Sequence, residues 1–315
     1  MAVAEARFRV MASEAQVIVV DGPPEAGNVA HRALDELERA WSRFVPGSDI
    51  DRLNHCQGFP VVVNEATLTL VETMVQAWQA TSGLLDPTVL PALLEAGYRS
   101  SVDDPEVFTT LPAGFEPGDA TMADVVIDRP ARAVALPDGL VLDAGGIGKG
   151  LAADLVVAEL LSRGVAGALV SVGGDLAAAG TPPSPDGWTI AVEDPFDQDA
   201  SLARLEVSGG GVATASTLSR RWTQRNAARH HLIDPATGAP SLTDLAAVTV
   251  IAPCGWQAEA HATALILGST VRFRTHAAAN DLGAIATTLD GRTMATDRLT
   301  PILARGPRPI QAAPA

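Results

Sequence analysis

The sequence has few cysteines, few basic side chains and no long apolar run, and each shortage excludes a class of protein. Its only cysteines, Cys56 and Cys254, form no CxxC pair, which excludes a disulfide framework and a structural zinc site. We expect both thiols to be buried and unreactive. The chain has 37 acidic and 22 basic side chains, a formal net charge of −15. Such a surface repels phosphate backbones, so we expect no nucleic-acid partner.

Signals for export and membrane insertion are also missing. No apolar stretch approaches the length of a membrane span, because Asp154, Glu159 and Arg163 interrupt the best candidate. We therefore expect no stable membrane insertion. The N-terminal residues lack the positively charged and apolar segments of a signal peptide. The expected location is the cytoplasm, or an exported or membrane-associated one if a leader is missing.

Apolar residues recur with helical and with strand spacing along the chain, which predicts mixed α and β structure. The predicted strands cover 15–20, 140–142, 168–172 and 248–252, and the predicted helices cover 28–41, 67–82, 151–161 and 257–267. Residues 99–138 are rich in Pro, Gly and Asp, so we expect a long surface excursion with at most one hairpin. Four prolines after Thr300 predict a disordered tail over 301–315.

A glycine-rich loop at 143–150, Asp-Ala-Gly-Gly-Ile-Gly-Lys-Gly, lies between a predicted strand and a predicted helix. In such a turn the backbone N–H groups point outward and the helix dipole favours an anion, so the loop fits a phosphorylated ligand. The loop lacks the glycine and the hydroxyl residue of a P-loop. Its glycines follow the order GxxGxG rather than the dinucleotide order GxGxxG. For this loop alone, a tight turn with no ligand remains the alternative.

Two later segments carry polar side chains suited to phosphate chemistry. His231 and Asp234 precede a predicted turn at 235–238, and a histidine beside a phosphate site can serve as a general base. A lone His-Asp pair is more often structural. Glu259 and Thr263 are four residues apart and share one helix face, where they offer the hard oxygen ligands that Mg²⁺ prefers. On that fragment alone, a glutamate complementing the helix dipole is the favoured interpretation.

Taken in order, these segments resemble the motifs of the FAD:protein FMN transferase family, often called ApbE. The family motifs are D-x-G-G-I-x-K-G, N-x-G-G-D, H-x-I-D-P-x-T-G and E-A-D-A-x-x-T. Two earlier ones are S-x-[FY]-x-P-x-S-x-[IL]-x-[RK]-[LF]-N and F-D-P-T-V. The similar segments are, in the same order, residues 143–150, 171–175, 231–238, 257–263, 42–54 and 85–89. The resemblance runs from about Met11 to about Gly268.

The resemblance implies a single α+β domain over 1–300, a mixed sheet with packed helices and a ligand cleft between two halves. It implies Mg²⁺-dependent transfer of FMN from the substrate FAD to a Ser/Thr hydroxyl of a protein with a D-G-x-[ST]-[GS]-A-[ST]-like motif, with AMP released. His231 and Asp234 would form the catalytic segment, with His231 as the base. The Gly146 carbonyl, Glu259 and Thr263 would hold the metal. The flavin nucleotide would contact Met11, Phe44, Leu84, Leu85, Asp86, Asp143, Lys149 and Ile233.

Some residues depart from the family pattern. Glu259 stands where the family usually has Asp, and its extra methylene moves the carboxylate by about 1.5 Å. Leu218 replaces an aromatic residue, and Phe44 occupies a place often held by Tyr. Two other functions stay open: a metal-dependent FAD pyrophosphatase that uses the same site without a protein acceptor and gives FMN and AMP, and a flavin-binding protein without chemistry, which is favoured if Glu259 fails to hold the metal.

Residues 290–296 look like the family's acceptor motif except at Met294. Self-flavinylation at Thr293 is therefore conceivable. A hairpin that turns at Asp290-Gly291 is the favoured interpretation of the same residues.

Overall fold

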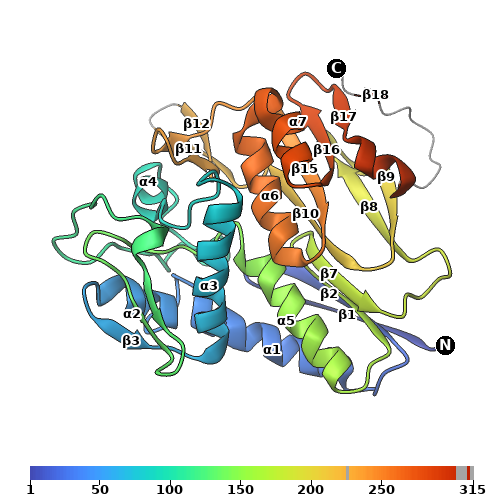
Figure 1. Ribbon diagram of the computed structural model, residues 1–315, viewed down its shortest axis with the longest axis horizontal. Coiled ribbons are helices and arrows are strands. Elements are labelled where there is room, and N and C mark those ends of the chain that lie inside the picture. Colours follow the sequence, from blue (N-terminus) through green and yellow to red (C-terminus); the bar gives the residue numbers. More distant parts are fainter. Residues whose placement is uncertain (225–226, 303–310, 313–315) are drawn as a thin grey trace.

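The fold is built around one large, almost wholly antiparallel sheet (Figure 1). The structure is a computed structural model that describes residues 1–224, 227–302 and 311–312. Only the last pair of neighbouring strands is parallel. In spatial order the strands are β1 (Val3–Val10), β2 (Ser13–Val20), β6 (Gly167–Val172), β7 (Asp175–Gly180), β10 (Gly210–Ser216), β15 (Leu245–Ala252), β16 (Gly283–Thr288), β17 (Thr293–Ala295) and β18 (Gln311–Ala312).

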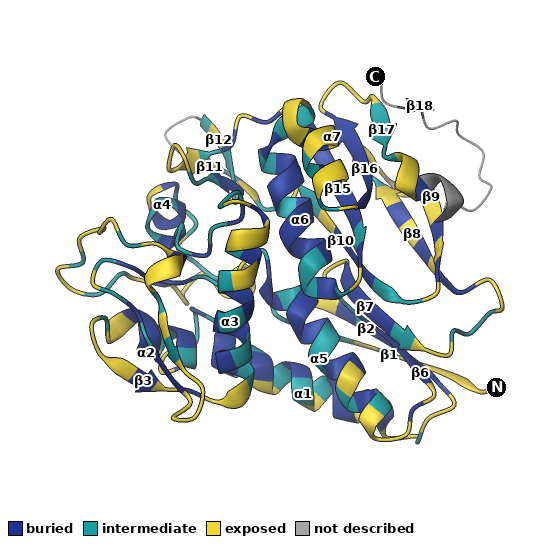
Figure 2. Cartoon of the chain, in the orientation of Figure 1, coloured by how far each residue is buried: buried dark blue, intermediate teal, exposed yellow. Residues whose placement is uncertain are grey.

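Both faces of this sheet are covered, so most of its strands are buried (Figure 2). One face carries the helices α1 (Ala26–Trp41), α5 (Gly148–Ser162), α6 (Gly255–Leu267) and α7 (Ser269–Ala279). The other face carries a hairpin of β8 (Trp188–Asp194) and β9 (Asp197–Val207). Trp188 anchors that hairpin against Leu169 and Leu176 of the sheet.

A second, loop-rich half is formed mainly by the residues between α1 and α5. It holds the helices α2 (Asp49–His55), α3 (Glu65–Ala80) and α4 (Leu90–Glu95), the 3₁₀ turn η1 (Met122–Asp124) and a small sheet of β3 (Pro60–Val62), β5 (Ala133–Ala135) and β4 (Val126–Asp128). Two short ribbons join the halves, β11 (Arg221–Gln224) with β12 (Ala227–His230), and β13 (Ile233–Asp234) with β14 (Ala239–Pro240). For example, Trp222 Nε1 donates to the Ala96 carbonyl at 2.8 Å.

The predicted α+β architecture is confirmed, and most predicted elements are present within a few residues of their expected ends. The predicted strand at 140–142 is wrong: these described residues are buried but form no strand. The side chain of Asn54 donates to the Leu142 carbonyl at 2.9 Å and accepts its N–H at 2.7 Å. One amide side chain thus satisfies the backbone groups that a neighbouring strand would otherwise pair.

The expectation for the two cysteines is half wrong. Cys254 is half-buried, and its burial raises the pKa of its thiol to about 11, which keeps it protonated. Cys56, by contrast, is exposed. The favoured interpretation of 290–296 holds, because Thr293 pairs with Thr287 across a hairpin that turns at 289–292.

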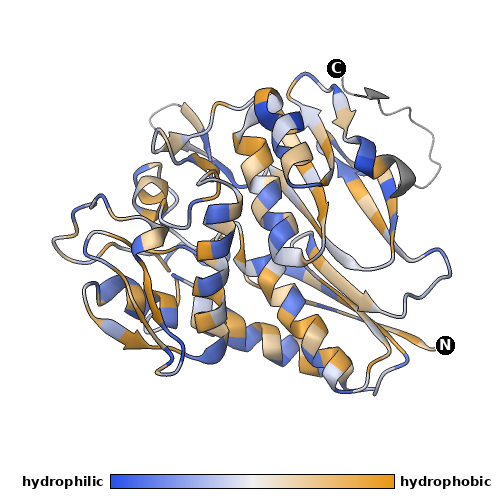
Figure 3. Ribbon diagram, viewed as in Figure 1, coloured by the Kyte–Doolittle hydropathy of each residue, from blue (hydrophilic) through white to orange (hydrophobic). Residues whose placement is uncertain are grey.

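The 301–315 tail lies outside the described residues except for 301–302 and 311–312. Within the described part of the chain, no helix combines the length and apolar character that a membrane crossing requires. The helices instead mix hydrophobic with hydrophilic residues (Figure 3).

Candidate active site

The floor of the site is the point where the first turns of α5 and α6 meet. A Cβ on Gly150 would lie 2.4 Å from the Gly255 carbonyl oxygen, and one on Gly255 would lie 2.5 Å from that of Gly150. Only glycine permits this approach. Each helix also caps the other. Asp154 of α5 accepts the N–H groups of Gly255 and Trp256 at 2.7 and 2.9 Å, and Glu259 of α6 accepts the N–H of Gly150 at 2.7 Å.

Above this floor lies a cavity of about 890 Å³, lined from both halves of the molecule. All the predicted nucleotide and metal residues line it, although they come from segments far apart in the sequence. They are Met11, Phe44, Leu84, Leu85, Asp86, Asp143, Gly146, Lys149, Ile233, Glu259 and Thr263. The predicted cleft between two halves is therefore present.

The three predicted metal ligands all line the cavity. Glu259 and Thr263 lie one turn apart on α6, and Glu259 is only 4% exposed. Gly146 has a φ of +84°, and a Cβ there would lie 2.9 Å from Leu85 and 3.6 Å from Thr263 Oγ1. The described residues include no cluster of three or more His, Cys, Asp or Glu side chains that would hold a metal by themselves. The predicted set is of another kind, with one carboxylate, one hydroxyl and one backbone carbonyl.

A buried charge cluster surrounds Glu259. Burial, together with the nearby carboxylate of Asp175, raises the pKa of Glu259 to about 8. Asp175 Oδ2 accepts a hydrogen bond from Lys149 Nζ at 3.0 Å, and its Oδ1 accepts one from the Thr214 N–H at 3.2 Å. Burial would lower the pKa of Lys149, but Asp175 and Glu259 outweigh it and raise this pKa, so the lysine stays charged. The cluster therefore places two acidic side chains near one ammonium group, which is hydrogen-bonded to Asp175.

The predicted catalytic pair is separated. His231 lines the cavity, and its buried Nδ1 has no hydrogen-bond partner among the described residues. Burial, followed by the charges of Arg220 and Lys149, lowers the pKa of His231 to about 3. Asp234 is not among the described residues that line the cavity. Its carboxylate accepts the N–H of Ala236 at 2.9 Å within the turn that joins β13 to β14.

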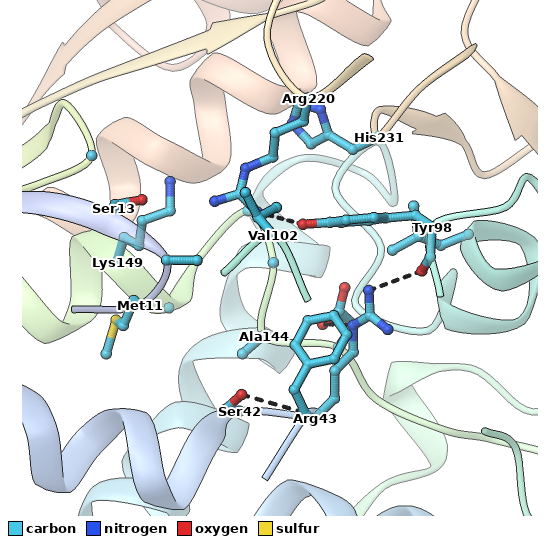
Figure 4. A pocket seen from close by; sticks show the side chains of 18 of the residues that line it. Met11, Ser13, Ser42, Arg43, Tyr98, Val102, Ala144, Lys149, Arg220 and His231 are labelled. Atoms are coloured by element: carbon cyan, nitrogen blue, oxygen red, sulfur yellow. Dashed lines mark hydrogen bonds and ion pairs between the residues drawn. The ribbon is translucent and has the colours of Figure 1, made fainter. Parts of the chain in front are cut away.

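Among the lining residues that sequence reasoning did not single out are Arg43, Tyr98 and Arg220 (Figure 4). The Arg43 guanidinium lies 4.1 Å from the centre of the Phe44 ring, and its Nη2 donates to the Tyr98 carbonyl at 3.1 Å. Its Nε is 3.4 Å from Asp143 Oδ1. Arg220 Nη1 donates to the Tyr98 hydroxyl at 2.7 Å. Arg43 lies within a matched motif and was detectable, whereas nothing in the sequence links Tyr98 to Arg220.

The fold and this cavity define a class of protein whose cleft between two halves suits an anionic ligand with a large apolar part. The sequence model of the ApbE family matches residues 11–286. The chain therefore belongs to the ApbE family, and the resemblance is confirmed.

Named relatives agree with this assignment. The FAD:protein FMN transferase of Salmonella typhimurium is 30% identical over 245 residues, which cover 75% of this chain and 69% of that protein. The Treponema pallidum protein of the same name is 28% identical over 260 residues, or 76% and 72% of the two chains.

Solved structures show the same fold. The apo form of the flavinyl transferase ApbE of Pseudomonas stutzeri matches with a TM-score of 0.80 and 26% identity, over 97% of this chain and 98% of that one. The ApbE protein of Thermotoga maritima matches with a TM-score of 0.83 over 96% and 100% of the chains. Its 22% identity supports the fold alone.

Proposed function

We propose that this protein is an FAD:protein FMN transferase, which moves FMN from FAD to a Ser or Thr hydroxyl of an acceptor protein and releases AMP. The observation that carries the proposal is the cavity: it joins an apolar, aromatic wall to a floor that bears Lys149 and Glu259, and His231 also lines it. The apolar, aromatic wall suits a flavin ring, and the polar floor suits a diphosphate. Family membership and the names of the relatives support the same reaction.

The reaction is a phosphoryl transfer. The acceptor hydroxyl oxygen attacks the phosphorus of the FMN half of FAD, the bond from that phosphorus to the bridging oxygen breaks, and AMP leaves with that oxygen. The hydroxyl proton passes to His231, which is neutral at physiological pH because its pKa is lowered to about 3. Arg220 and Lys149 contribute to that lowering. An anionic diphosphate beside these two cations would offset their charge and make His231 a stronger base.

Mg²⁺ fits the floor of this cavity, where Glu259, Thr263 and the carbonyl of Gly146 would hold it. All three donors are oxygens, which this hard cation prefers, and the repulsion between Asp175 and Glu259 leaves a place where added positive charge is favourable. When bound, the ion would neutralise charge on the phosphate oxygens. Glu259 would have to lose its proton first. The positive charge of the neighbouring Lys149 favours that loss, because it lowers the pKa of Glu259.

The apolar wall would hold the flavin end of the substrate. Met11, Phe44 and Leu85 supply apolar surface to the cavity, with the Arg43 guanidinium fixed over the Phe44 ring. Asp86 is held by its own turn, since its Oδ1 accepts the N–H and the hydroxyl of Thr88 at 2.8 and 2.7 Å. This wall can therefore orient a planar ring while the floor holds the phosphates.

The test incubates the protein with FAD and Mg²⁺, with and without an acceptor that carries the D-G-x-T-G-A-T pattern. Flavin fluorescence on the acceptor in a denaturing gel is the expected result. FMN and AMP released with no labelled acceptor would instead support the pyrophosphatase, and tight FAD binding with neither product would support a flavin-binding protein. An unchanged intact mass without acceptor would exclude self-flavinylation at Thr293.

Glu259→Ala sharpens this test, because it removes the only carboxylate among the three proposed ligands. We expect turnover to fall by at least about 100-fold. Glu206→Ala is the matched control, since Glu206 is exposed on β9 and is not among the described residues that line the cavity. Equal activity in the two variants would remove the proposed metal site.

A further inference from the structure

A short loop between β10 and β11 fixes the position of Arg220. Thr217 Oγ1 donates to the Leu245 carbonyl at 3.0 Å, and Ser219 Oγ donates to the Ser216 carbonyl at 3.1 Å. Arg220 itself has a φ of +46°, a left-handed conformation that non-glycine residues adopt uncommonly. The loop therefore holds this arginine in a costly conformation that turns its side chain into the cavity (Figure 4).

A hydrogen bond from the other half of the molecule orients the guanidinium. Its Nη1 donates to the hydroxyl of Tyr98 at 2.7 Å, and the Tyr98 ring stacks on Trp222, with 5.5 Å between the ring centres. The Tyr98 carbonyl also accepts from Arg43 Nη2. Tyr98, the only tyrosine in the chain, is thus fixed on two sides and links the loop-rich half to Arg220.

Arg220 has no carboxylate partner within the part of the chain that the structure describes, unlike its neighbour in the cavity, Lys149, which pairs with Asp175. Figure 4 shows Arg220 and Lys149 reaching toward the same space, with His231 next to Arg220. A half-buried guanidinium that is oriented by a neutral hydroxyl keeps its remaining donors for an anion.

We propose that Arg220 is a second cationic contact for the FAD diphosphate, that it acts opposite Lys149, and that Tyr98 is its positioning residue. This inference rests on the proposed function for the identity of the ligand. The planar fork of a guanidinium matches two phosphate oxygens at once, which a lysine cannot do. The assignment also explains why the loop tolerates a strained arginine where a glycine would be easier.

The experiment compares Arg220→Asn with the wild type and with Arg221→Asn. Asparagine tolerates the left-handed backbone, so Arg220→Asn removes the guanidinium with little added strain. Arg221 is an exposed neighbour outside the described cavity lining, and its variant makes the same change in charge. Three ligands are titrated against each protein: FAD and riboflavin by flavin fluorescence, and inorganic pyrophosphate as a competitor of FAD. Thermal melting checks that each variant is folded.

We expect Arg220→Asn to weaken FAD and pyrophosphate by about 10- to 100-fold, and riboflavin by less than about twofold, because only the first two carry a diphosphate. Arg220→Lys should recover part of the loss. Tyr98→Phe removes only the hydroxyl, and we expect it to lower kcat by about three- to tenfold while the KM for FAD changes less. Arg221→Asn should match the wild type.

Two results would overturn the inference. One is FAD affinity in Arg220→Asn within twofold of the wild type. The other is an equal loss for riboflavin, which would mean a purely structural role. Failure of the proposed function looks different: the wild type would bind FAD through Arg220 yet label no acceptor. A wild type that binds neither FAD nor pyrophosphate would refute both.

Discussion

The floor of the cavity and the wall that faces it are built in opposite ways. The floor is made of helix starts in close backbone contact, where buried carboxylates of each helix cap the other. The facing wall, which carries Arg43, Phe44, Tyr98 and Arg220, is made of connecting segments. Its aromatic and arginine side chains are held by contacts with one another. We therefore expect the floor to couple ligand chemistry to the stability of the fold, and changes in the facing wall to affect folding less. The predictions below test this contrast.

The largest effect is expected from closing the gap between α5 and α6. Gly150→Ala would put a Cβ 2.4 Å from a backbone oxygen that cannot move without shifting α6. We expect the free energy of unfolding to fall by about 3 kcal/mol or more. Gly283→Ala is the control, because its new Cβ would lie 3.4 Å from the flexible Leu299 side chain, an ordinary contact. Similar urea midpoints for both variants would argue against close contact at the floor.

The next prediction separates the two roles of Glu259. A glutamine at this position can still accept the N–H of Gly150 but carries no charge. Glu259→Gln should leave the metal-free protein as stable as the wild type or more so, because a buried carboxylate is costly. It should also abolish the rise in melting temperature that we expect Mg²⁺ to give the wild type, and with it FMN transfer. A variant that still responds to Mg²⁺ would place the metal elsewhere.

The raised pKa of Glu259 predicts how Mg²⁺ binding depends on pH. The folded carboxyl has a pKa of about 8 against 4.5 in the unfolded chain, so between these values the folded state binds the extra proton. Stability of the metal-free protein should therefore fall as pH rises from 5 to 8. The ion needs the ionised carboxylate, so its apparent affinity should rise about tenfold per pH unit until pH 8. Isothermal titration at pH 6.5, 7.5 and 8.5 measures this, and a flat profile would contradict it.

This dependence of Glu259 on its surroundings shows where sequence reasoning ends. The motifs identified the family, because their residues are short local patterns in the sequence, and the resemblance to the family in turn implied the cleft and placed Glu259 in it. They did not reveal that the longer Glu259 side chain reaches the backbone of α5, or that Asn54 replaces a strand at Leu142. The pairing of Tyr98 with Arg220 was equally hidden, since it joins residues 122 positions apart.

The same limit explains two further expectations that the structure does not support, for Asp234 and for Cys56. Asp234 stands in a matched motif, yet its carboxylate serves the turn that follows rather than the cavity. A motif can contain residues that stabilise the fold as well as residues that take part in the reaction. Sequence spacing alone does not distinguish these two kinds of residue. Cys56 follows α2 directly, at an exposed helix end where burial could not be read from residue type.

The smallest effect on stability is expected from the facing wall. Phe44 is half-buried and contributes a ring face to the cavity under the Arg43 guanidinium. Phe44→Ala should weaken FAD binding by about tenfold, since stacking on an aromatic ring is lost, and should change the free energy of unfolding by about 1 kcal/mol or less. Phe44→Tyr keeps the ring face, so its affinity for FAD should stay within about twofold of the wild type. If Phe44→Ala instead destabilised the fold as strongly as Gly150→Ala, the facing wall would be as much a part of the folding core as the floor, and the contrast between the two would fail.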